Sequence, residues 1–328
     1  MKPELDLSII IVSYNTKDMT RRCLESVYGH TAGMSCEIIV VDNGSSDASA
    51  DMVGQDFPGV TLLRLEKNLG FAAGNNHGIA RACGRYILLL NSDAFLCEGV
   101  LESTLGYMEN NPRVGILGCM LTDPDGTPQP SARMQPSALN KFLVITGLSS
   151  RFPGSRIFGR ADFSWWDHSR PRRVGWVVGA YFLIRSETIA DIGMLDERYF
   201  LYFEEIDYCK AAQRSLWDVV FYPYARVVHI GGQSAQNTRA EMSSKGRQLL
   251  GYRIQSEFRY YRKWYGIIPV MTSAGVELLW KALVVLKNSP FRSEGARQKR
   301  REAIVTIKTI LSTLVTDRFG RGKPAYDG

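Results

Sequence analysis

The sequence predicts an α/β protein built on a doubly wound, mostly parallel sheet. Apolar runs without alternation, typical of strands that are covered on both faces, make up most of residues 7–12 and 37–41 and all of residues 86–90. Segments with apolar residues at helical spacing separate these runs, as in residues 17–28. Strand and helix signals alternate in this way through roughly the first 90 residues, and such alternation is typical of parallel strands joined by helical crossovers.

The remaining elements are expected in order along the chain. A third strand at 60–65 precedes a glycine-rich stretch at 68–78, and a helix should then run to Cys83. Later elements are expected as a helix at 99–110, a strand at 114–118, an irregular stretch at 121–173, a buried strand at 174–184, a helix from 204, and short strands at 219–222 and 225–229. An irregular stretch of that length is usually functional or mobile.

Polar residues follow three of the expected strands directly, at 13–15, 42–47 and 91–93. Turn chemistry alone would explain any one of these clusters. In open parallel sheets, however, ligands bind in the crevice beyond the carboxyl ends of the strands, so all three clusters should face one crevice. This convergence favours a ligand-binding site.

The net charge of +7 is unevenly distributed along the chain. Residues 1–238 hold 22 Lys and Arg against 26 Asp and Glu, whereas residues 239–328 hold 18 against 7. We therefore expect a domain over 1–238 and a basic, helical tail over 239–328, with phospholipid headgroups or nucleic acid as the partner of the tail. The six cysteines are scattered, which favours free thiols in a reducing compartment, and no secretory signal is expected at the N-terminus.

The most apolar part of the tail, residues 267–286, is long enough to cross a bilayer. It also contains Pro269, Glu277 and Lys281, and these charges favour an amphipathic helix on the membrane surface over a span. The basic run at 297–301 could contact headgroups, although a solvated charge run explains it equally well.

Several residues have side chains suited to acid–base or metal chemistry. Asp93 follows a buried strand, and proteins typically hold Mg²⁺ with one or two carboxylates while substrate phosphates complete its shell. Glu204, Glu205 and Asp207 lie within one helical turn, where like charges raise the pKa of a general base; an acidic first turn that complements the helix dipole is the alternative. His229 ends a strand and could bind a Mn²⁺-like ion or be a polar strand terminus.

The glycine-rich stretch at 68–78 holds three glycines, which permit close approach of the backbone to a ligand. It matches neither the Walker nor the dinucleotide-binding pattern, so on its own it is a weak motif.

Five motifs, taken together and in this order, resemble those of family 2 glycosyltransferases. They read IIIVSYN at 9–15, VVDNGSSD at 40–47, NLGFAAGN at 68–75, LLNSD at 89–93 and FEEIDYC at 203–209. The resemblance covers about the first 235 residues. The strand with Gly179 and Ala180, the acidic helix and the strand ending at His229 look most like bacterial rhamnosyltransferases of cell-surface polysaccharide assembly.

The resemblance implies a Rossmann-like GT-A fold, with a donor half at 1–120 and an acceptor half at 121–238. The implied donor-binding residues are Ser13, Tyr14, Asn15, Asp42, Asn68, Gly70, Asn75, Asn91 and Ser92. Asp93 and His229 are the implied ligands of Mg²⁺ or Mn²⁺. Position 91, often Asp in the family, is Asn here, which leaves one carboxylate for the metal.

On the acceptor side, the resemblance implies Glu205 as the catalytic base. The further residues expected there are Gly179, Ala180, Glu204, Trp165 and Trp166. The two tryptophans are included because aromatic faces suit sugar rings, although core packing explains each of them equally well.

The implied reaction is an inverting single displacement, in which Glu205 takes the acceptor proton and the metal stabilises the departing nucleoside diphosphate. We expect dTDP-rhamnose as donor, with a UDP-hexose or UDP-N-acetylhexosamine as the alternative. The expected acceptor is a glycan or lipid-linked saccharide on the cytoplasmic face of the plasma membrane, reached through the tail, with no nucleic acid as partner.

Two other classes of protein remain as comparisons. A nucleotidyltransferase would carry an Arg- and Lys-bearing glycine-rich loop after the first strand, where this sequence has Ser-Tyr-Asn at 13–15. A non-enzymatic module that binds anionic surfaces would rest on the basic tail alone.

Overall fold

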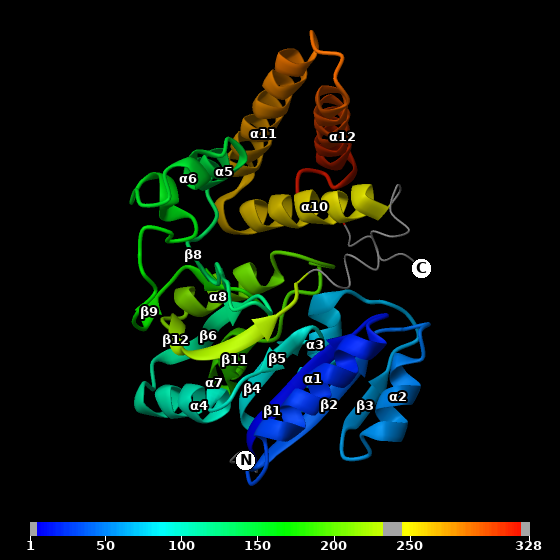
Figure 1. Ribbon diagram of the computed structural model, residues 1–328, viewed down its shortest axis with the longest axis vertical. Coiled ribbons are helices and arrows are strands. Elements are labelled where there is room, and N and C mark those ends of the chain that lie inside the picture. The colour runs from blue at the N-terminus through cyan, green and yellow to red at the C-terminus, as the bar shows by residue number, and fades with distance from the viewer. Residues whose placement is uncertain (1–4, 232–244, 323–328) are drawn as a thin grey trace.

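Four parallel strands form one half of the main sheet in the computed structural model, which describes residues 5–231 and 245–322. They are β1 (Leu5–Ser13), β2 (Cys36–Asp42), β3 (Thr61–Arg64) and β4 (Gly84–Asn91), in the spatial order β3-β2-β1-β4. Three helices connect them, namely α1 (Lys17–His30), α2 (Ser49–Asp56) and α3 (Phe71–Ile79). Figure 1 shows this half in blue and cyan, and its alternation of strand and helix confirms the predicted α/β class.

The second half makes the sheet mixed. Strand β11 (Tyr181–Arg185) runs antiparallel between β4 and β6 (Val114–Thr122). Strand β12 (Asp218–His229) lies parallel to β6, and the short β5 (Ala94–Leu96) pairs antiparallel with the end of β12. The two short strands expected at 219–222 and 225–229 are thus one strand, whose register with β6 shifts between Tyr222 and Arg226.

The other described elements surround this sheet. They are α4 (Val100–Asn110), β7 (Pro128–Gln129), β8 (Ala132–Arg133), α5 (Ala138–Ile145), α6 (Leu148–Arg151), a 3₁₀ turn at Phe158–Arg160, β9 (Arg172–Arg173), β10 (Trp176–Val177), α7 (Ser186–Ile192), α8 (Glu204–Arg214), α10 (Lys245–Tyr265), α11 (Ile267–Asn288) and α12 (Glu294–Thr316). The stretch at 121–173, expected to be irregular, therefore contains short strands and helices.

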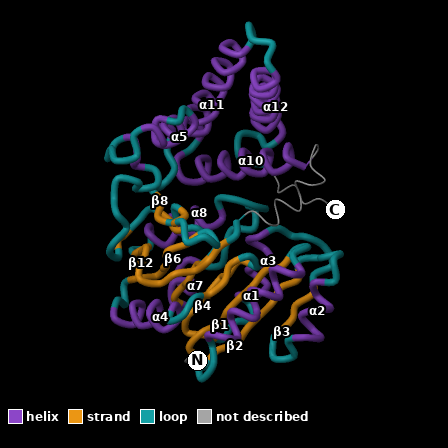
Figure 2. Tube along the Cα trace, in the orientation of Figure 1, coloured by secondary structure: helices purple, strands orange, loops and turns teal. Residues whose placement is uncertain are grey.

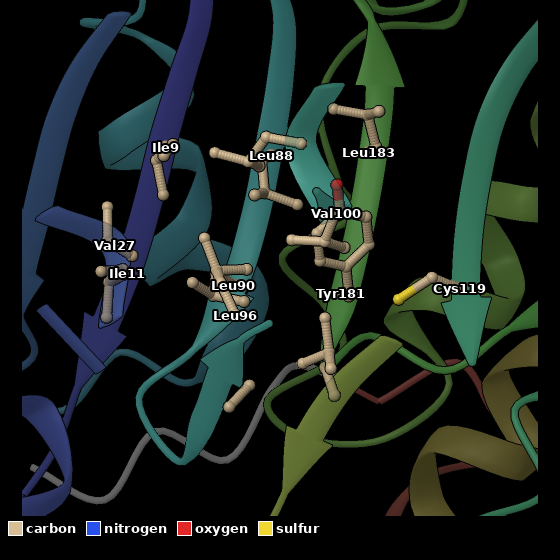
Figure 3. Close-up of a cluster of buried hydrophobic side chains, with 14 of the residues drawn as sticks. Ile9, Ile11, Val27, Leu88, Leu90, Leu96, Val100, Cys119, Tyr181 and Leu183 are labelled. Carbon is tan, nitrogen blue, oxygen red and sulfur yellow. The ribbon is translucent and has the colours of Figure 1, made fainter. Parts of the chain in front are cut away.

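Apolar side chains cover both faces of the sheet. On one face, Ile9, Ile11 and Leu88 pack against α1 and α4, through residues such as Val27 and Val100 (Figure 3). On the other face, alternate residues of the same strands pack against α3, α7 and α8. Each fully buried Ile or Leu contributes roughly 1.5–3 kcal/mol. Burial on both sides explains why these strands read as apolar runs without alternation.

The glycine-rich stretch is itself helical. We expected a helix to follow it, but α3 begins at Phe71, inside the stretch, and ends at Ile79, one residue beyond it. A Cβ atom at Gly78 would overlap the Ile10 side chain, and one at Gly74 would lie 2.9 Å from a methyl of Val12. These two glycines therefore allow α3 to pack closely on β1.

The C-terminal helices lie at one end of the molecule, beyond the strands of the sheet (Figure 2). Helix α10 packs against the segment around α8, where Tyr199 and Ile206 share an apolar core with Phe258 and Tyr260. The boundary expected at 238 lies outside the described residues. Residues 245–265 thus pack onto the segment around α8 rather than extend away from it.

Candidate active site

The carboxyl ends of three neighbouring strands meet at one edge of the sheet. Ser13 at the end of β1 is in register with Asp42 of β2, and Val12 is in register with Asn91 of β4. Across this edge the Thr16 hydroxyl lies 3.1 Å from the Ser92 hydroxyl. The polar clusters that follow the strands are therefore contiguous.

Hydrogen bonds join the loops after β1 and β2. The backbone N–H of Asn15, which has a positive φ of 52°, donates to Ser45 Oγ at 3.0 Å. The Asn15 side-chain carbonyl in turn accepts from the N–H of Ser46 at 2.8 Å. Tyr14 is half-buried beside them, whereas the hydroxyl of the buried Ser13 hydrogen-bonds within the protein, to Thr16 and Thr20.

A polar cavity of about 390 Å³ opens beside these loops. Asp42, Ser45 and Ser46 line it together with Arg64. Asp42 Oδ2 accepts from the Ser45 N–H at 3.1 Å, while the buried Oδ1 has no hydrogen-bond partner among the described residues. An unpaired buried acceptor is costly, so this oxygen suits a ligand that brings its own donor, such as a ribose hydroxyl or a base N–H.

A pair of asparagines ties the loop after β2 to the start of α3. Asn43 Nδ2 donates to Asn68 Oδ1 at 2.9 Å, and the same oxygen accepts from the N–H of Gly70 at 2.9 Å. Gly70 has a φ of +87°, and a Cβ there would overlap the Phe200 carbonyl, so glycine is needed at this position for the backbone conformation and for the close approach of Phe200. Asn75 is buried and donates to the Phe71 carbonyl within α3. Sequence reasoning missed Asn43, although it directly follows a strand.

Asn91 lies between the donor-side loops and the acceptor side. Its N–H donates to the Ala180 carbonyl at 3.1 Å, which places Gly179 and Ala180 beside the end of β4. The side-chain carbonyl of Asn91 is buried without a hydrogen-bond partner among the described residues. Like Asp42, it is an acceptor available to a bound ligand.

Asp93 and His229 lie together, although 136 positions separate them in the sequence. His229 is in register with Ala94 of β5, and its Nε2 lies 3.5 Å from Asp93 Oδ1. Two ligand atoms of one cation, each about 2.1 Å from it, are about 3 to 3.5 Å apart. The pair therefore fits a divalent cation such as Mn²⁺, which accepts both imidazole and carboxylate ligands. No third His, Cys, Asp or Glu joins them in the described part of the chain, so water or the oxygens of a ligand would complete the shell of such a cation.

The two glutamates open helix α8. The preceding Tyr202 and Phe203 both have left-handed backbone, with φ of 68° and 69°, a conformation that non-glycine residues rarely adopt outside functional sites. Glu204 is buried, whereas Glu205 is half-buried, and a Cβ at Gly179 would lie 3.8 Å from Glu205 Cβ.

Burial raises the pKa of both glutamates. Desolvation raises the pKa of Glu205 to about 7 and, together with the charge of Glu205, raises that of Glu204 well above its usual value. Oε2 of each glutamate has no hydrogen-bond partner among the described residues. Asp207 is separate from this pair because it binds Tyr199, Lys263 and Trp264. At neutral pH, Glu205 is thus the carboxyl group suited to act as a base.

A mostly apolar cavity of about 380 Å³ opens beside Glu205. Its walls come from the segment before α5, from α5, α8 and α10, and include Arg133, Lys141, Trp176 and Arg253. The part of its lining that α10 supplies, at Arg253, Glu257 and Tyr261, belongs to the segment we expected to be a tail. No local sequence pattern indicated that these residues would reach Glu205.

Trp165 and Trp166 do not line this cavity. Trp165 packs edge-on against Phe163, and Trp166 packs against Phe221 of β12. The structure therefore places both with the core, whereas the tryptophan at the cavity is Trp176, whose indole N–H donates to the Met134 carbonyl at 2.9 Å.

The sequence is similar to those of known transferases. The N-acetylglucosaminyl-diphospho-decaprenol L-rhamnosyltransferase of Mycobacterium tuberculosis is 28% identical over 236 residues, which cover 68% of this chain and 75% of that protein. The low-salt glycan biosynthesis hexosyltransferase Agl10 of Haloferax volcanii is 24% identical over 258 residues, covering 77% of this chain and 73% of that protein.

Solved structures share the fold. The mannosyltransferase PcManGT of Pyrobaculum calidifontis, in complex with GDP-Man and Mn²⁺, superposes with a TM-score of 0.55 at 13% identity, over 95% of this chain and 88% of that one. GalNAc-T7 with UDP, GalNAc and Mn²⁺ gives 0.56 at 14% identity, over 96% of this chain and 57% of that one. These likenesses confirm the expected GT-A-type fold and show the fold alone. Residues 8–171, half of the chain, match the sequence profile of Glycosyl transferase family 2, and the chain belongs to this family.

Proposed function

We propose that this glycosyltransferase moves rhamnose from dTDP-rhamnose, with inversion and with a divalent cation, to a hydroxyl group of a lipid-linked saccharide. The mycobacterial rhamnosyltransferase supports both the sugar and the acceptor class. UDP-hexoses and UDP-N-acetylhexosamines are the alternative donors. The observation that carries the proposal is Glu205, a carboxyl group with a pKa of about 7 at the wall of a cavity.

The donor and acceptor would occupy two different cavities. In the proposed complex, the nucleoside occupies the polar cavity beside Asp42, and the acceptor sugar occupies the cavity beside Glu205. Asp93 and His229 would hold the cation, which when bound stabilises negative charge on the departing diphosphate. Glu205 accepts the proton of the acceptor hydroxyl, whose oxygen bonds to the anomeric carbon as the bond from that carbon to the diphosphate breaks.

Binding of the nucleotide can be tested without knowing the acceptor. A thermal-shift panel of nucleoside diphosphates and their sugars, with and without Mn²⁺ or Mg²⁺, should show cation-dependent stabilisation by the dTDP ligands. A ligand at a hundred times its dissociation constant stabilises the fold by about 2.7 kcal/mol. Stabilisation by UDP ligands alone would show that the donor is a UDP-sugar and not dTDP-rhamnose. No shift with any nucleotide would contradict the proposed use of a nucleotide-sugar donor.

We further propose that α11 lies on a membrane, which would hold the enzyme at the cytoplasmic face where a lipid-linked acceptor is found. It is the one helix of the described residues that is long and apolar enough to cross a bilayer. Its outward face lacks charged side chains from residue 268 to residue 286 and exposes Ile268 at 72%, Leu279 at 65% and Leu286 at 67%. A helix in water would show the opposite arrangement.

The acidic side chain of α11, Glu277, instead points inward. Glu277 is 3% exposed, and its carboxylate pairs with Lys141 Nζ at 2.7 Å and with Arg253 at 2.8 Å. Burial opposes its ionisation, but these two cations hold the pKa of Glu277 below its usual value. Because this polar side packs on α5 and α10, lipid could cover only the opposite side, which favours the membrane surface over a span.

A further inference from the structure

We propose that Gln129, held by Asp123, is a positioning residue that fixes the His229 imidazole with its Nε2 lone pair turned toward Asp93, and so sets the affinity of the site for a divalent cation. The inference rests on the proposed function, because it assigns a role in the cation site to residues that do not themselves contact the cation.

The two residues belong to the hairpin that follows β6. Gln129 lies in β7, in register with Leu121. Asp123 opens the turn between the strands, where its N–H donates to the Thr127 carbonyl at 2.8 Å and its carbonyl accepts from the N–H of Gly126 at 2.9 Å. The hairpin thus holds both side chains on rigid backbone beside the end of β12.

The hydrogen bonds of Gln129 fix its orientation. Its Nε2 lies 2.7 Å from the His229 backbone carbonyl and 2.7 Å from Asp123 Oδ1, and both of these atoms can only accept. Nε2 must therefore be the amide nitrogen, with both hydrogens used. Gln129 Oε1, the acceptor, then faces His229 Nδ1 at 2.9 Å.

This arrangement determines the tautomer of His229. Because Gln129 Oε1 can only accept, His229 Nδ1 must carry the proton that it donates. In the neutral imidazole, Nε2 then carries the lone pair, and it is the atom that lies 3.5 Å from Asp93 Oδ1. Two electron-pair donors at this separation favour a cation between them.

The proposed cation site has only two protein ligands among the described residues, so the orientation of each should affect metal affinity strongly. No third His, Cys, Asp or Glu of the described residues joins Asp93 and His229, and Asn91 stands where an acid would add a second carboxylate. Groups that orient a metal-ligating histidine typically change metal affinity by 10–100-fold when they are removed. Free histidine in water, by contrast, favours the other tautomer, which would present N–H to the metal position.

Four variants of this chain distinguish loss of the His229 orientation from a general loss of stability. Gln129→Leu removes the acceptor for Nδ1–H. Gln129→Glu keeps an acceptor for Nδ1–H but sets carboxylate oxygen against both Asp123 and the His229 carbonyl. The double variant Asp123→Asn/Gln129→Glu restores the donor–acceptor pair between residues 123 and 129 with the net charge unchanged, and leaves the contact with the carbonyl unrestored. Gln213→Leu is the matched control, because Gln213 also donates to two backbone carbonyls, of Val174 and Gly175, but does not contact His229.

The first readout is Mn²⁺ affinity, measured from the signal of free Mn²⁺ in electron paramagnetic resonance with a saturating nucleoside diphosphate. Gln129→Leu should bind Mn²⁺ 10–100-fold more weakly than the wild type. Gln129→Glu should also bind more weakly, the double variant should bind more tightly than Gln129→Glu, and Gln213→Leu should match the wild type. Equal affinity of Gln129→Leu and the wild type would overturn the inference alone, whereas a wild type that binds no Mn²⁺ with any nucleotide would overturn the proposed cation site with it.

The second readout needs no metal. Long-range ¹H–¹⁵N correlation spectra report the tautomer of each of the four histidines, and a His229→Gln variant assigns the relevant signals. His229 should be protonated on Nδ1 in the wild type and in the double variant, and should shift toward Nε2 protonation in Gln129→Leu. A wild-type His229 protonated on Nε2 would overturn the inference, even where Gln129→Leu is too unstable for metal titration.

Discussion

Replacing Glu205 with Gln should abolish sugar transfer and at the same time stabilise the folded protein at neutral and alkaline pH. The side chain keeps its shape but can no longer take a proton, and loss of a general base typically costs 10²–10⁴-fold in rate. The gain in stability follows from the same burial that makes Glu205 a base near pH 7, because the folded protein must hold its ionised form in a poorly solvated place.

The size of the stability change follows from the pKa of Glu205, which burial raises from 4.5 to about 7. Below pH 4.5 the carboxyl group is protonated in both the folded and the unfolded chain, so its burial does not lower the free energy of unfolding through ionisation. Between pH 4.5 and pH 7 the unfolded chain loses the proton first, and the free energy of unfolding falls as pH rises. Above pH 7 the loss of stability reaches its full size, on the order of 3 kcal/mol, and Glu205→Gln should recover it.

Urea unfolding at pH 5, 7 and 8 measures this difference, and the pH dependence of kcat/KM in the wild type should show half-maximal activity near pH 7. Glu204→Gln is the control. Burial also raises the pKa of Glu204 well above its usual value, so Glu204→Gln should likewise be more stable than the wild type at pH 8. Half-maximal activity near pH 4.5, or equal stability of Glu205→Gln and the wild type at pH 8, would refute the reasoning.

Three further outcomes are expected. Asp93→Asn should abolish Mn²⁺-dependent thermal stabilisation by a nucleoside diphosphate while the melting temperature without ligand stays unchanged; undiminished stabilisation would exclude this carboxylate as a ligand. Gly78→Ala should lower the free energy of unfolding by about 1–3 kcal/mol in urea because its Cβ overlaps Ile10, whereas Gly106→Ala, in open space on α4, should be neutral or stabilising. Leu279→Glu should reduce flotation with anionic phospholipid vesicles, whereas a matched Glu at Leu216, 85% exposed but outside α11, should not; equal flotation of both variants would exclude the α11 face.

Much of the donor side could be predicted because it follows from a rule about strands. Ser13, Asp42 and Asn91 end neighbouring strands, and carboxyl ends of parallel strands share one edge of a sheet. The polar residues after each strand therefore had to meet once the alternation of strand and helix was recognised. What the sequence did not reveal is which polar atoms bind each other, as in the Asn43–Asn68 pair.

The pairing of Asp93 with His229 could be anticipated only through the family resemblance. It depends on β12 lying antiparallel to β5, a contact between segments far apart in the sequence that no local pattern reports. The position of the aromatic residues is similarly a tertiary property. Trp165, Trp166 and Trp176 are all half-buried residues of one segment, and packing alone decides that only Trp176 reaches the cavity.

The basic tail was the least predictable part, because net charge reports composition and not the direction of side chains. Glu277 and Lys281 led us to expect an amphipathic helix on the membrane surface at 267–286, but not that Glu277 would be buried against other helices while the exposed face is apolar. The partner that makes this possible is Lys141, a single charge on α5 that lies 136 positions earlier. Buried ions need such partners, and sequence patterns do not identify them.

The same buried charges connect the proposed membrane surface to the acceptor cavity. Lys141 and Arg253 line the cavity beside Glu205, and both also pair with Glu277 of α11. Because these ion pairs fix the polar side of α11 inward, they also fix its apolar side outward, and Val144 of α5, half exposed, lies at the cavity as well. A membrane that covers the apolar face of α11 would therefore lie close to the cavity. The sugar of a lipid-linked acceptor could then reach Glu205 while its lipid stays in the bilayer.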